Sequence, residues 1–247
     1  MVNLNDIELK CFGSEYGHWC FIPHDGLKNS TIVSGGVGED ISFDVDFASE
    51  YNATVIFYDP TPRSIKHFEN VKKNFGKESE LSYVAGGNQP IETYDLSNLS
   101  ESNFVYNPYA LWKEKSKVKF FAPTNPNHVS HSILNYQRNY DMSDNNYIEV
   151  ECLKLSDEIK TLEKFPEIIK LDIESAVLEV IDDLFSENIF VNQICVEYDE
   201  QHNLNSISVD RIKKMNNLFH NNDYICVHQE YSNYLFVNKL FLDTVLK

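Results

Sequence analysis

The sequence of 247 residues predicts an α/β fold built on a mainly parallel, doubly wound sheet that ends in a C-terminal antiparallel hairpin. From residue 31 onward, short apolar runs alternate with longer amphipathic runs, which is typical of parallel strands connected by helices. The last two apolar runs, 223–229 and 233–239, are separated by only three residues and are therefore expected to pair as a hairpin. The length predicts one domain, 1–247, with an N-terminal arm over 1–30 and an insertion over 88–146.

The first half of the chain shows this alternation clearly. The run ATVIFYD (53–59) is β-branched and aromatic, so it predicts a buried strand, and this strand stops at Pro60. Thr61 is a suitable N-cap, and Pro62 would then occupy the first helical position. In order, the patterns predict strands at 31–34, 53–59 and 81–86 and helices at 41–51 and 61–75.

The insertion interrupts the alternation. It contains four of the eight prolines and many Asn, Ser and Tyr residues, with one strand predicted at 117–122. A long irregular stretch in a compact domain is usually functional, for example as a lid or a substrate-binding segment. After it, the patterns predict strands at 146–155, 167–173, 192–199, 223–229 and 233–239 and helices at 156–165, 175–187 and 206–221.

Composition excludes several classes of protein. The chain has 21 Lys and Arg against 38 Asp and Glu, a net charge of −17, which argues against a nucleic-acid polymer as partner. No apolar run approaches the ~18 residues of a membrane span, and the N-terminus lacks the features of a signal peptide. The five cysteines are odd in number and form no C-x-x-C pair, so we expect reduced thiols in a cytoplasmic protein.

A glycine-rich turn follows the first predicted strand. Gly36 and Gly38 lie where this strand meets a helix, and glycines at such a place let a ligand approach the backbone and the helix N-terminus. A dinucleotide-binding turn would have a third glycine where this chain has Ile41. Glu39 and Asp40 would repel a pyrophosphate and favour a positively charged ligand, such as a sulfonium.

An acidic residue ends the second predicted strand. Asp59 follows Gly38 by 21 residues, close to the ~20-residue spacing at which a carboxylate accepts hydrogen bonds from a ribose. Both features would lie at the carboxyl edge of the sheet, where open α/β folds bind ligands. The alternative interpretation is a tight turn and a helix-capping Asp that bind nothing.

These residues resemble the FkbM-type S-adenosylmethionine-dependent methyltransferases. The matching stretches are GHWC (17–20), SGGVGEDISFD (34–44), FYDPTPRS (57–64), APTNPNHVSHSIL (122–134), IIKLDIESAVLEVI (168–181) and ICVEYDE (194–200). The resemblance implies a seven-stranded, Rossmann-like methyltransferase fold, S-adenosylmethionine as cofactor, and O-methyl transfer, most often to a sugar hydroxyl.

The resemblance also implies roles for individual residues. Those implied to bind the cofactor are Gly36, Gly38 and Glu39 at its methionine end, Asp59 at the ribose, Ala85 and Gly86 near the adenine, and Asp172 beside the site of transfer. Two departures from the family pattern stand out. Ser34 replaces the usual acid before the glycines, and Ser175 and Val177 replace the glycine and the last acid of D-x-E-G-A-E.

Four acidic residues follow two neighbouring strands of the predicted sheet. Asp172 and Glu174 end the fourth strand, and Glu197 and Asp199 end the fifth. Asp172 and Glu197 could face each other across the transfer site as catalytic groups, while Glu174 and Asp199 would contact the substrate. The four could instead hold a divalent metal such as magnesium, with Asp172 and Glu197 as ligands, or be solvated charges at strand ends.

Side chains from the arm and the insertion could complete the site. An imidazole suits a general base, so we expect His131 to be catalytic and His128 to contact the substrate, although both could be ordinary loop residues. Trp19 could stack against a sugar or simply pack on the sheet.

The sequence thus predicts an O-methyltransferase of a sugar hydroxyl, on a nucleotide-linked sugar or on a precursor of a bacterial capsule or surface glycan. Alternatives are methylation of a small natural product, or a non-catalytic family member that binds only the cofactor or a glycan. A Rossmann oxidoreductase is the least favoured. The sequence does not indicate the oligomeric state.

Overall fold

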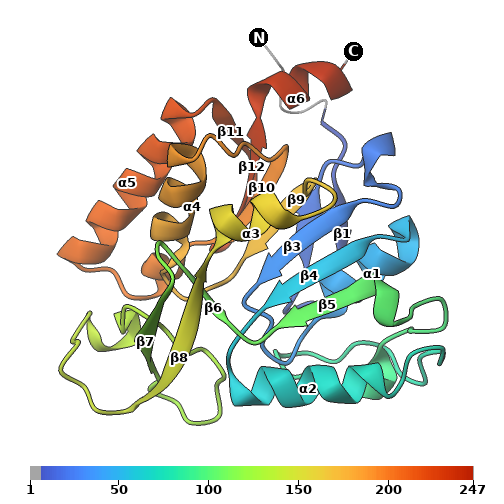
Figure 1. Cartoon of the computed structure of the whole chain (residues 1–247), viewed down its shortest axis with the longest axis horizontal. Coiled ribbons are helices and arrows are strands. Elements are labelled where there is room, and N and C mark those ends of the chain that lie inside the picture. The colour runs from blue at the N-terminus through green and yellow to red at the C-terminus, as the bar shows by residue number, and fades with distance from the viewer. Residues whose placement is uncertain (1–6, 247) are drawn as a thin grey trace.

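A computed structural model describes residues 7–246 of the chain (Figure 1). Its strands are β1 (Lys10–Phe12), β2 (Trp19–Phe21), β3 (Thr31–Gly35), β4 (Thr54–Tyr58), β5 (Phe104–Asn107), β6 (Ala110–Trp112), β7 (Ser116–Phe121), β8 (Tyr147–Lys154), β9 (Ile168–Leu171), β10 (Gln193–Glu197), β11 (Tyr224–Glu230) and β12 (Asn233–Asn238). Its α-helices are α1 (Ser42–Tyr51), α2 (Pro62–Lys72), α3 (Leu155–Thr161), α4 (Val177–Ser186), α5 (Ser206–Asn221) and α6 (Lys239–Val245).

Seven strands form the main sheet, in the order β11-β12-β10-β9-β3-β4-β5. Neighbours from β10 to β5 pair in parallel, whereas β12 is antiparallel to both β10 and β11. The predicted mainly parallel sheet with a C-terminal antiparallel hairpin is therefore confirmed, although the sheet as a whole is mixed. From β3 the chain continues outward to β4 and β5, whereas from the neighbouring β9 it continues in the opposite direction to β10. A doubly wound sheet opens a crevice for a ligand at such a point between two strands.

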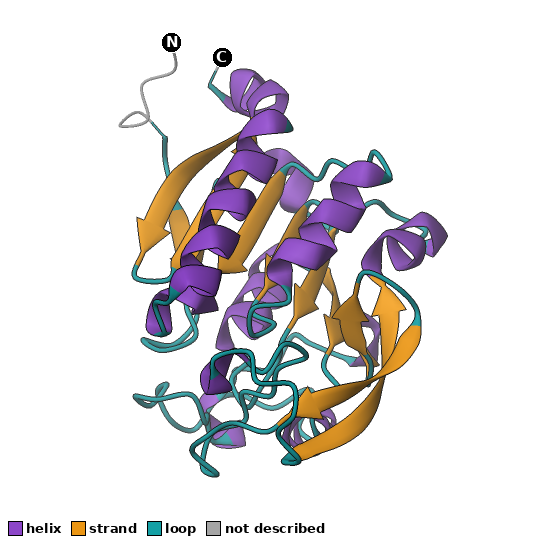
Figure 2. Ribbon diagram, turned by 90° about the vertical axis from the view of Figure 1, so that its left-hand side faces the viewer, coloured by secondary structure: helices purple, strands orange, loops and turns teal. Residues whose placement is uncertain are grey.

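Helices cover both faces of this sheet (Figure 2), because its strands are apolar on both sides. In β3, Ile32 packs into one buried cluster with α1, α2 and α6, and the adjacent Val33 packs into a second cluster with α3, α4 and α5. In β9, Ile168 and Ile169 divide between the same two clusters. The two-residue period of a strand thus places one hydrophobic core on each side.

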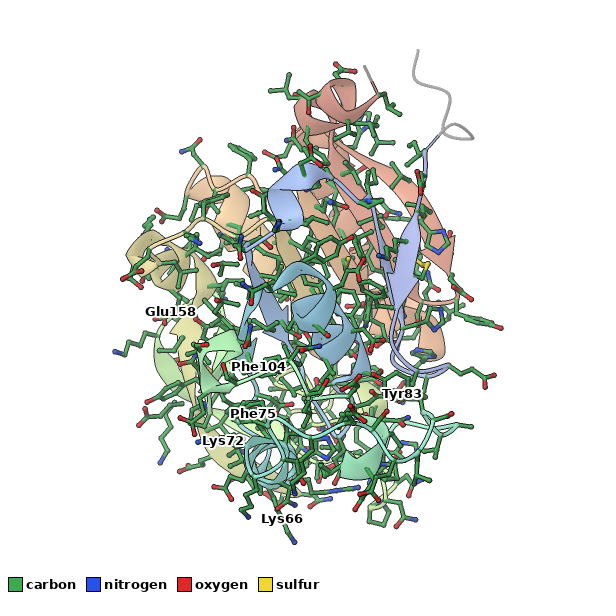
Figure 3. The ribbon with its side chains drawn as sticks, turned by 90° about the vertical axis from the view of Figure 1, so that its right-hand side faces the viewer. Lys66, Lys72, Phe75, Tyr83, Phe104 and Glu158 are labelled. Atoms are coloured by element: carbon green, nitrogen blue, oxygen red, sulfur yellow. A yellow bond between two sulfur atoms is a disulfide. The ribbon has the colours of Figure 1, made fainter. Side chains whose placement is uncertain are left out.

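The third strand of the sheet differs from the sequence prediction. Residues 81–86 form no strand, and β5 pairs with β4 instead. Phe104 of β5 is buried and stacks on Phe75, which follows α2, with ring centroids 5.7 Å apart (Figure 3). Leu81 and Val84 are exposed, so the predicted run lacks the burial that a central strand requires.

The predicted insertion is consequently shorter than expected, because β5 belongs to the main sheet. Beyond β5, strands β6, β7 and β8 form a separate three-stranded sheet in which β8 is parallel to β6 and antiparallel to β7. The strands predicted at 117–122 and 146–155 are thus present as β7 and β8. They build the second sheet, which stands beside the end of the main sheet (Figure 1).

The N-terminal arm contains a short hairpin that the sequence analysis did not predict. Strands β1 and β2 pair antiparallel with Cys11 opposite Cys20, and the two cysteines form a disulfide. The expectation that all five cysteines are reduced thiols is therefore wrong for this pair. Cross-strand neighbours lie close enough for a disulfide, but nothing in the cysteine spacing shows that their strands pair.

Among the helices of the described residues, none is both long enough and apolar enough to cross a membrane.

Candidate functional site

A cavity of about 740 Å³ lies at the carboxyl ends of the parallel strands. This volume falls in the range of about 300–1,000 Å³ that is usual for small-molecule sites. Its walls come from the N-terminal arm, the turn after β3, the insertion, and the ends of β4, β9 and β10. The residues singled out in the sequence that line it are Trp19, Gly36, Gly38, Glu39, Asp59, His128, His131, Asp172, Glu174, Glu197 and Asp199.

Ala85 and Gly86 do not line this cavity. They were placed near an adenine because the third strand was predicted to end there, and that strand is absent. Their loop is held by the buried side chain of Gln89, which donates to the carbonyl oxygens of Val84 (2.7 Å) and Gly86 (3.1 Å). Gly87 is the residue of this loop that reaches the cavity wall.

Gly36 is required by packing within the protein. It has a φ of +75°, and a Cβ at this position would lie 1.6 Å from the carbonyl oxygen of Asp172. Residue 36 must therefore be glycine for the turn to pack against the end of β9. At Gly38, with a φ of +58°, an added Cβ would have only Val129 within 4 Å, at 3.4 Å, so here the turn faces the insertion.

Asp59 holds the glycine turn from the other side. One carboxylate oxygen accepts hydrogen bonds from the backbone N–H groups of Val37 and Gly38, both 2.9 Å long, and the other accepts from Thr61 (2.8 Å). Asp59 thus ties the end of β4 to the turn after β3 and supports the start of α2. A carboxylate has about four acceptor positions, so these three bonds leave room for one more at the cavity.

The two acids of the turn are already paired within the protein. Glu39 forms an ion pair with Arg63, which also donates to the carbonyl of Asn127 (2.7 Å). Asp40 accepts from the backbone of Ser42 (2.9 Å) and from the hydroxyl of Ser14 (2.6 Å), so it fastens the N-terminal arm to the start of α1. Both carboxylates line the cavity, but each is already engaged by partners within the protein.

The acids after β9 and β10 gather at one end of the cavity. Carboxylate oxygens of Asp172, Glu174 and Asp199 lie within 4.8 Å of one another, and Asp172 is within hydrogen-bonding reach of Glu197. Burial and the charge of Glu197 raise the pKa of Asp172 well above its usual range. Burial and the charge of Glu197 also raise the pKa of Glu174 to about 7.

Glu197 remains ionised because its partners favour the charged form. Although burial opposes ionisation, hydrogen bonds to His202, Asp172 and Ser232 lower the pKa of Glu197 to about 2. The imidazole of His202 lies 3.2 Å from Glu197, and the hydroxyl of Ser232 donates to the same oxygen at 2.8 Å. Asp172 and Glu197 therefore share one proton, and the pair carries a single negative charge.

His202, which the sequence analysis did not single out, lines the cavity at this acid pair. It lies in a short 3₁₀ segment after β10, and its place five residues beyond Glu197 was the available signal. Lys170, also missed, is buried on β9 and donates to the carbonyl of Gly36 (3.3 Å). A lysine within the apolar run 167–173 was an irregularity that could have revealed it.

The insertion places His131 against the cavity. Its ring stacks on Phe120 with centroids 5.6 Å apart, and its Nδ1 lies 2.9 Å from the carbonyl oxygen of Val129. Since a carbonyl only accepts, Nδ1 carries the hydrogen and Nε2 is left with a free lone pair. His128 is exposed at the cavity rim.

The N-terminal arm covers another part of the cavity. Trp19 is only 5% exposed, and its ring centroid lies 5.5 Å from the ammonium of Lys170. Tyr16 lies over Gly87, where an added Cβ would come within 2.5 Å of the tyrosine ring. Trp19 is therefore packed against the sheet as well as lining the cavity, and Tyr16 is the more exposed aromatic residue of the arm.

The turn after β9 adopts a left-handed backbone without glycine. Glu174 and Ser175 have φ values of +53° and +68°. The N–H of Ser175 donates to Asp199 (2.7 Å), and its carbonyl accepts from Arg211. The departure at Ser175 from the glycine of the family pattern thus leaves a glycine-like conformation in place.

We expect Ser175→Gly to stabilise the protein by about 1 kcal/mol, because glycine removes the cost of the left-handed backbone and of a buried, unpartnered hydroxyl. Ser156→Gly is the matched control. Its hydroxyl is also buried and unpartnered, but it lies in α3, where the helical backbone makes glycine unfavourable by roughly 0.5 kcal/mol, so Ser156→Gly should gain less stability than Ser175→Gly. Urea unfolding measures both, and a loss of stability in Ser175→Gly would contradict this account.

The pKa of Glu174 predicts a pH-dependent stability. Because its folded-state pKa, about 7, exceeds the ordinary value of 4.5, its contribution to stability is complete below pH 4.5 and is lost as pH rises through 7. Glu174→Gln should match the wild type near about pH 4 and exceed it by up to about 3 kcal/mol near about pH 8. Chemical unfolding across this range measures the difference, with Glu69→Gln on the exposed side of α2 as a control that should follow the wild type.

The chain was compared with known sequences and solved structures. No curated protein sequence matches the chain. A solved structure described as monomeric WbdD superposes with a TM-score of 0.45 at 10% identity, covering 85% of this chain and 36% of that one. The fibrillarin pre-rRNA processing protein of Methanococcus jannaschii superposes with a TM-score of 0.41 at 9% identity, covering 96% and 83%. Neither TM-score reaches 0.5, and the chain spans about a third of the length of WbdD.

A profile of one protein family matches most of the chain. The profile of the methyltransferase FkbM domain matches residues 37–226, which is well over half of the chain. The match includes Asp59, the insertion and all four acids after β9 and β10. The chain therefore belongs to the FkbM methyltransferase family.

Proposed function

We propose that this protein is an S-adenosylmethionine-dependent O-methyltransferase that acts on a sugar hydroxyl. The acceptor would be a nucleotide-linked sugar or a precursor of a bacterial capsule or surface glycan. The observation that carries the proposal is that the glycine turn, Asp59 and the proton-sharing pair Asp172–Glu197 line the same cavity in a member of a methyltransferase family.

The residues present fit this cofactor. Asp59 has one acceptor position left for a ribose hydroxyl, and the cavity is large enough for a nucleoside with a substrate beside it. One buried carboxylate oxygen of Glu174 has no hydrogen-bond partner within the part of the chain that the structure describes. The cofactor, when bound, supplies a methyl group on a positively charged sulfonium, and the net negative acid cluster would stabilise that charge.

Transfer to a hydroxyl also requires a group that takes its proton. His131 meets this need, because its Nδ1–H is held by Val129 and its free Nε2 belongs to a side chain that lines the cavity. Asp172 and Glu197 would orient the hydroxyl, and Glu174 and Asp199 would accept hydrogen bonds from other hydroxyls of the sugar. The same oxygens could hold a divalent cation, and the closest set is then Asp172, Glu174 and Asp199.

The departures in the family motif do not favour a non-catalytic protein. Ser175 keeps the left-handed turn that glycine would provide, and Ser34 accepts a hydrogen bond from the buried Lys170 (3.4 Å). The cavity therefore keeps its shape despite both substitutions.

A titration tests the ribose contact. S-adenosylhomocysteine and its 2′-deoxy analogue are titrated calorimetrically into wild type and Asp59→Asn. In the wild type the analogue should bind about tenfold more weakly or worse, as expected for a lost hydrogen bond to a charged group. In Asp59→Asn the two ligands should bind alike, while Asp95→Asn, at an exposed turn, should behave as wild type. An equal penalty in wild type and Asp59→Asn would remove Asp59 from the ribose site.

Methyl transfer tests the chemistry. With radiolabelled S-adenosylmethionine and a panel of free and nucleotide-linked sugars, His131→Ala should lower turnover by about 10²–10⁴-fold and leave S-adenosylhomocysteine affinity unchanged. Glu197→Gln is the discriminating variant, because Glu197 is the charged member of the acid pair beside the transfer site. If it abolishes turnover while His131→Ala does not, the carboxylate is the base. If the cofactor binds but no sugar is methylated, the acceptor class is wrong.

A further inference from the structure

A second, much smaller cavity lies behind the rim of the main one, between the N-terminal arm and the C-terminal hairpin. It measures about 10 Å³, close to the space of a single water molecule or ion, and its walls include His18, Cys20, His228 and Glu230. His18 and Glu230 also line the main cavity, so the two sites share a wall.

The polar atoms around this small cavity form a set of metal ligands. The sulfur of Cys20, a ring nitrogen of His228 and a carboxylate oxygen of Glu230 lie within 4.8 Å of one another. Nε2 of His228 is 3.8 Å from the Glu230 carboxylate. Thiolate, imidazole and carboxylate together are a typical ligand set for zinc, which binds them at about 2.0–2.3 Å, so small side-chain rotations would bring all three to one ion.

Two further observations indicate a bound ligand here. Nε2 of His228 is buried and has no hydrogen-bond partner among residues 7–246, which is costly unless something binds it. The Glu230 carboxylate oxygen that lies nearest His228 is also held by Nε2 of His18, at 2.8 Å. Such a contact from a second residue is what usually orients a metal-binding carboxylate.

The fold brings these residues together from opposite ends of the chain. Cys20 is buried on β2, and His228 and Glu230 lie two residues apart on β11, just after the irregularity in its pairing with β12. Alternation along the strand gives His228 and Glu230 the same face. Gln229 lies between them and is exposed.

The sulfur of Cys20 can bind a metal only when its disulfide is reduced. Cys20 is bonded to Cys11 on β1, and a disulfide sulfur is not the thiolate that zinc requires. A dithiol reductant would transfer two electrons and two protons to this bond and itself become a disulfide, leaving two cysteine thiols. Binding of zinc to Cys20 would then release the proton of that thiol.

We propose that Cys20, His228 and Glu230 form a zinc site that exists only when the Cys11–Cys20 disulfide is reduced, with His18 as the residue that positions Glu230. The site would fasten the arm to β11 in place of the disulfide. It does not depend on the reaction proposed above.

The test is zinc stoichiometry on the full chain, by native mass spectrometry and by competition with a chromogenic chelator. Reduced wild type should bind one zinc ion more than oxidised wild type. Cys11→Ser cannot form the disulfide but keeps all the ligands, so it should bind this additional zinc ion with or without reductant. Cys20→Ser and His228→Ala should lose the site, and His18→Ala should bind about 10–100-fold more weakly.

Cys226→Ser is the matched control, because its sulfur lies near the carbonyl of His228 (3.4 Å) but outside the ligand set. It should bind zinc as the wild type does. Cobalt substitution adds a second readout, since a thiolate-to-cobalt absorption band should be present in Cys11→Ser and absent in Cys20→Ser. Equal zinc binding by oxidised and reduced wild type, or retention of the site in Cys20→Ser, would overturn the proposal.

Discussion

The contact between the glycine turn and the end of β9 is the constraint on which the rest of the site depends. Gly36 meets the carbonyl oxygen of Asp172 so closely that any side chain at position 36 would overlap it. Asp59 holds the same turn from the β4 side through the backbone of Val37 and Gly38. Three strand ends are thereby fixed relative to one another, and the acids that follow β9 and β10 take their positions from this arrangement.

The electrostatics of the cavity follow from burial of several carboxylates in one place. Removal from water favours the protonated form, so Asp172 keeps a proton, and Glu197 stays charged because His202 and Ser232 stabilise the charge. Such a cluster opposes folding at neutral pH, because ionisation of Glu174 beside Glu197 costs free energy. The same cluster provides carboxylates that can bind a cation and accept or donate a proton.

Segments distant in sequence close over the strand ends. The N-terminal arm is held by two contacts, a hydrogen bond from Ser14 to Asp40 and the contact between His18 and Glu230. The insertion is held by the hydroxyl of Ser132, which donates to the carbonyl of Glu174 (2.8 Å). Each attachment uses a polar group near the cavity. Hydrogen bonds therefore connect the arm and the insertion to the strand ends below them. A change in the conformation of the arm would alter the wall of the cavity directly.

The sequence by itself determined most of the main sheet and the edge of it at which the cavity lies. Periodicity is a local property, so the parallel strands, their helices and the terminal hairpin could be predicted, as could the placement of Asp59 and the four later acids at one edge. Only the tertiary structure decided which segments pair. It placed β5 rather than residues 81–86 beside β4, Cys11 opposite Cys20, and Glu39 against Arg63. It also placed His202 and Lys170 at the cavity. Which partners a side chain has, and how deeply it is buried, depends on which segments of the chain meet, and a local sequence pattern does not contain this information.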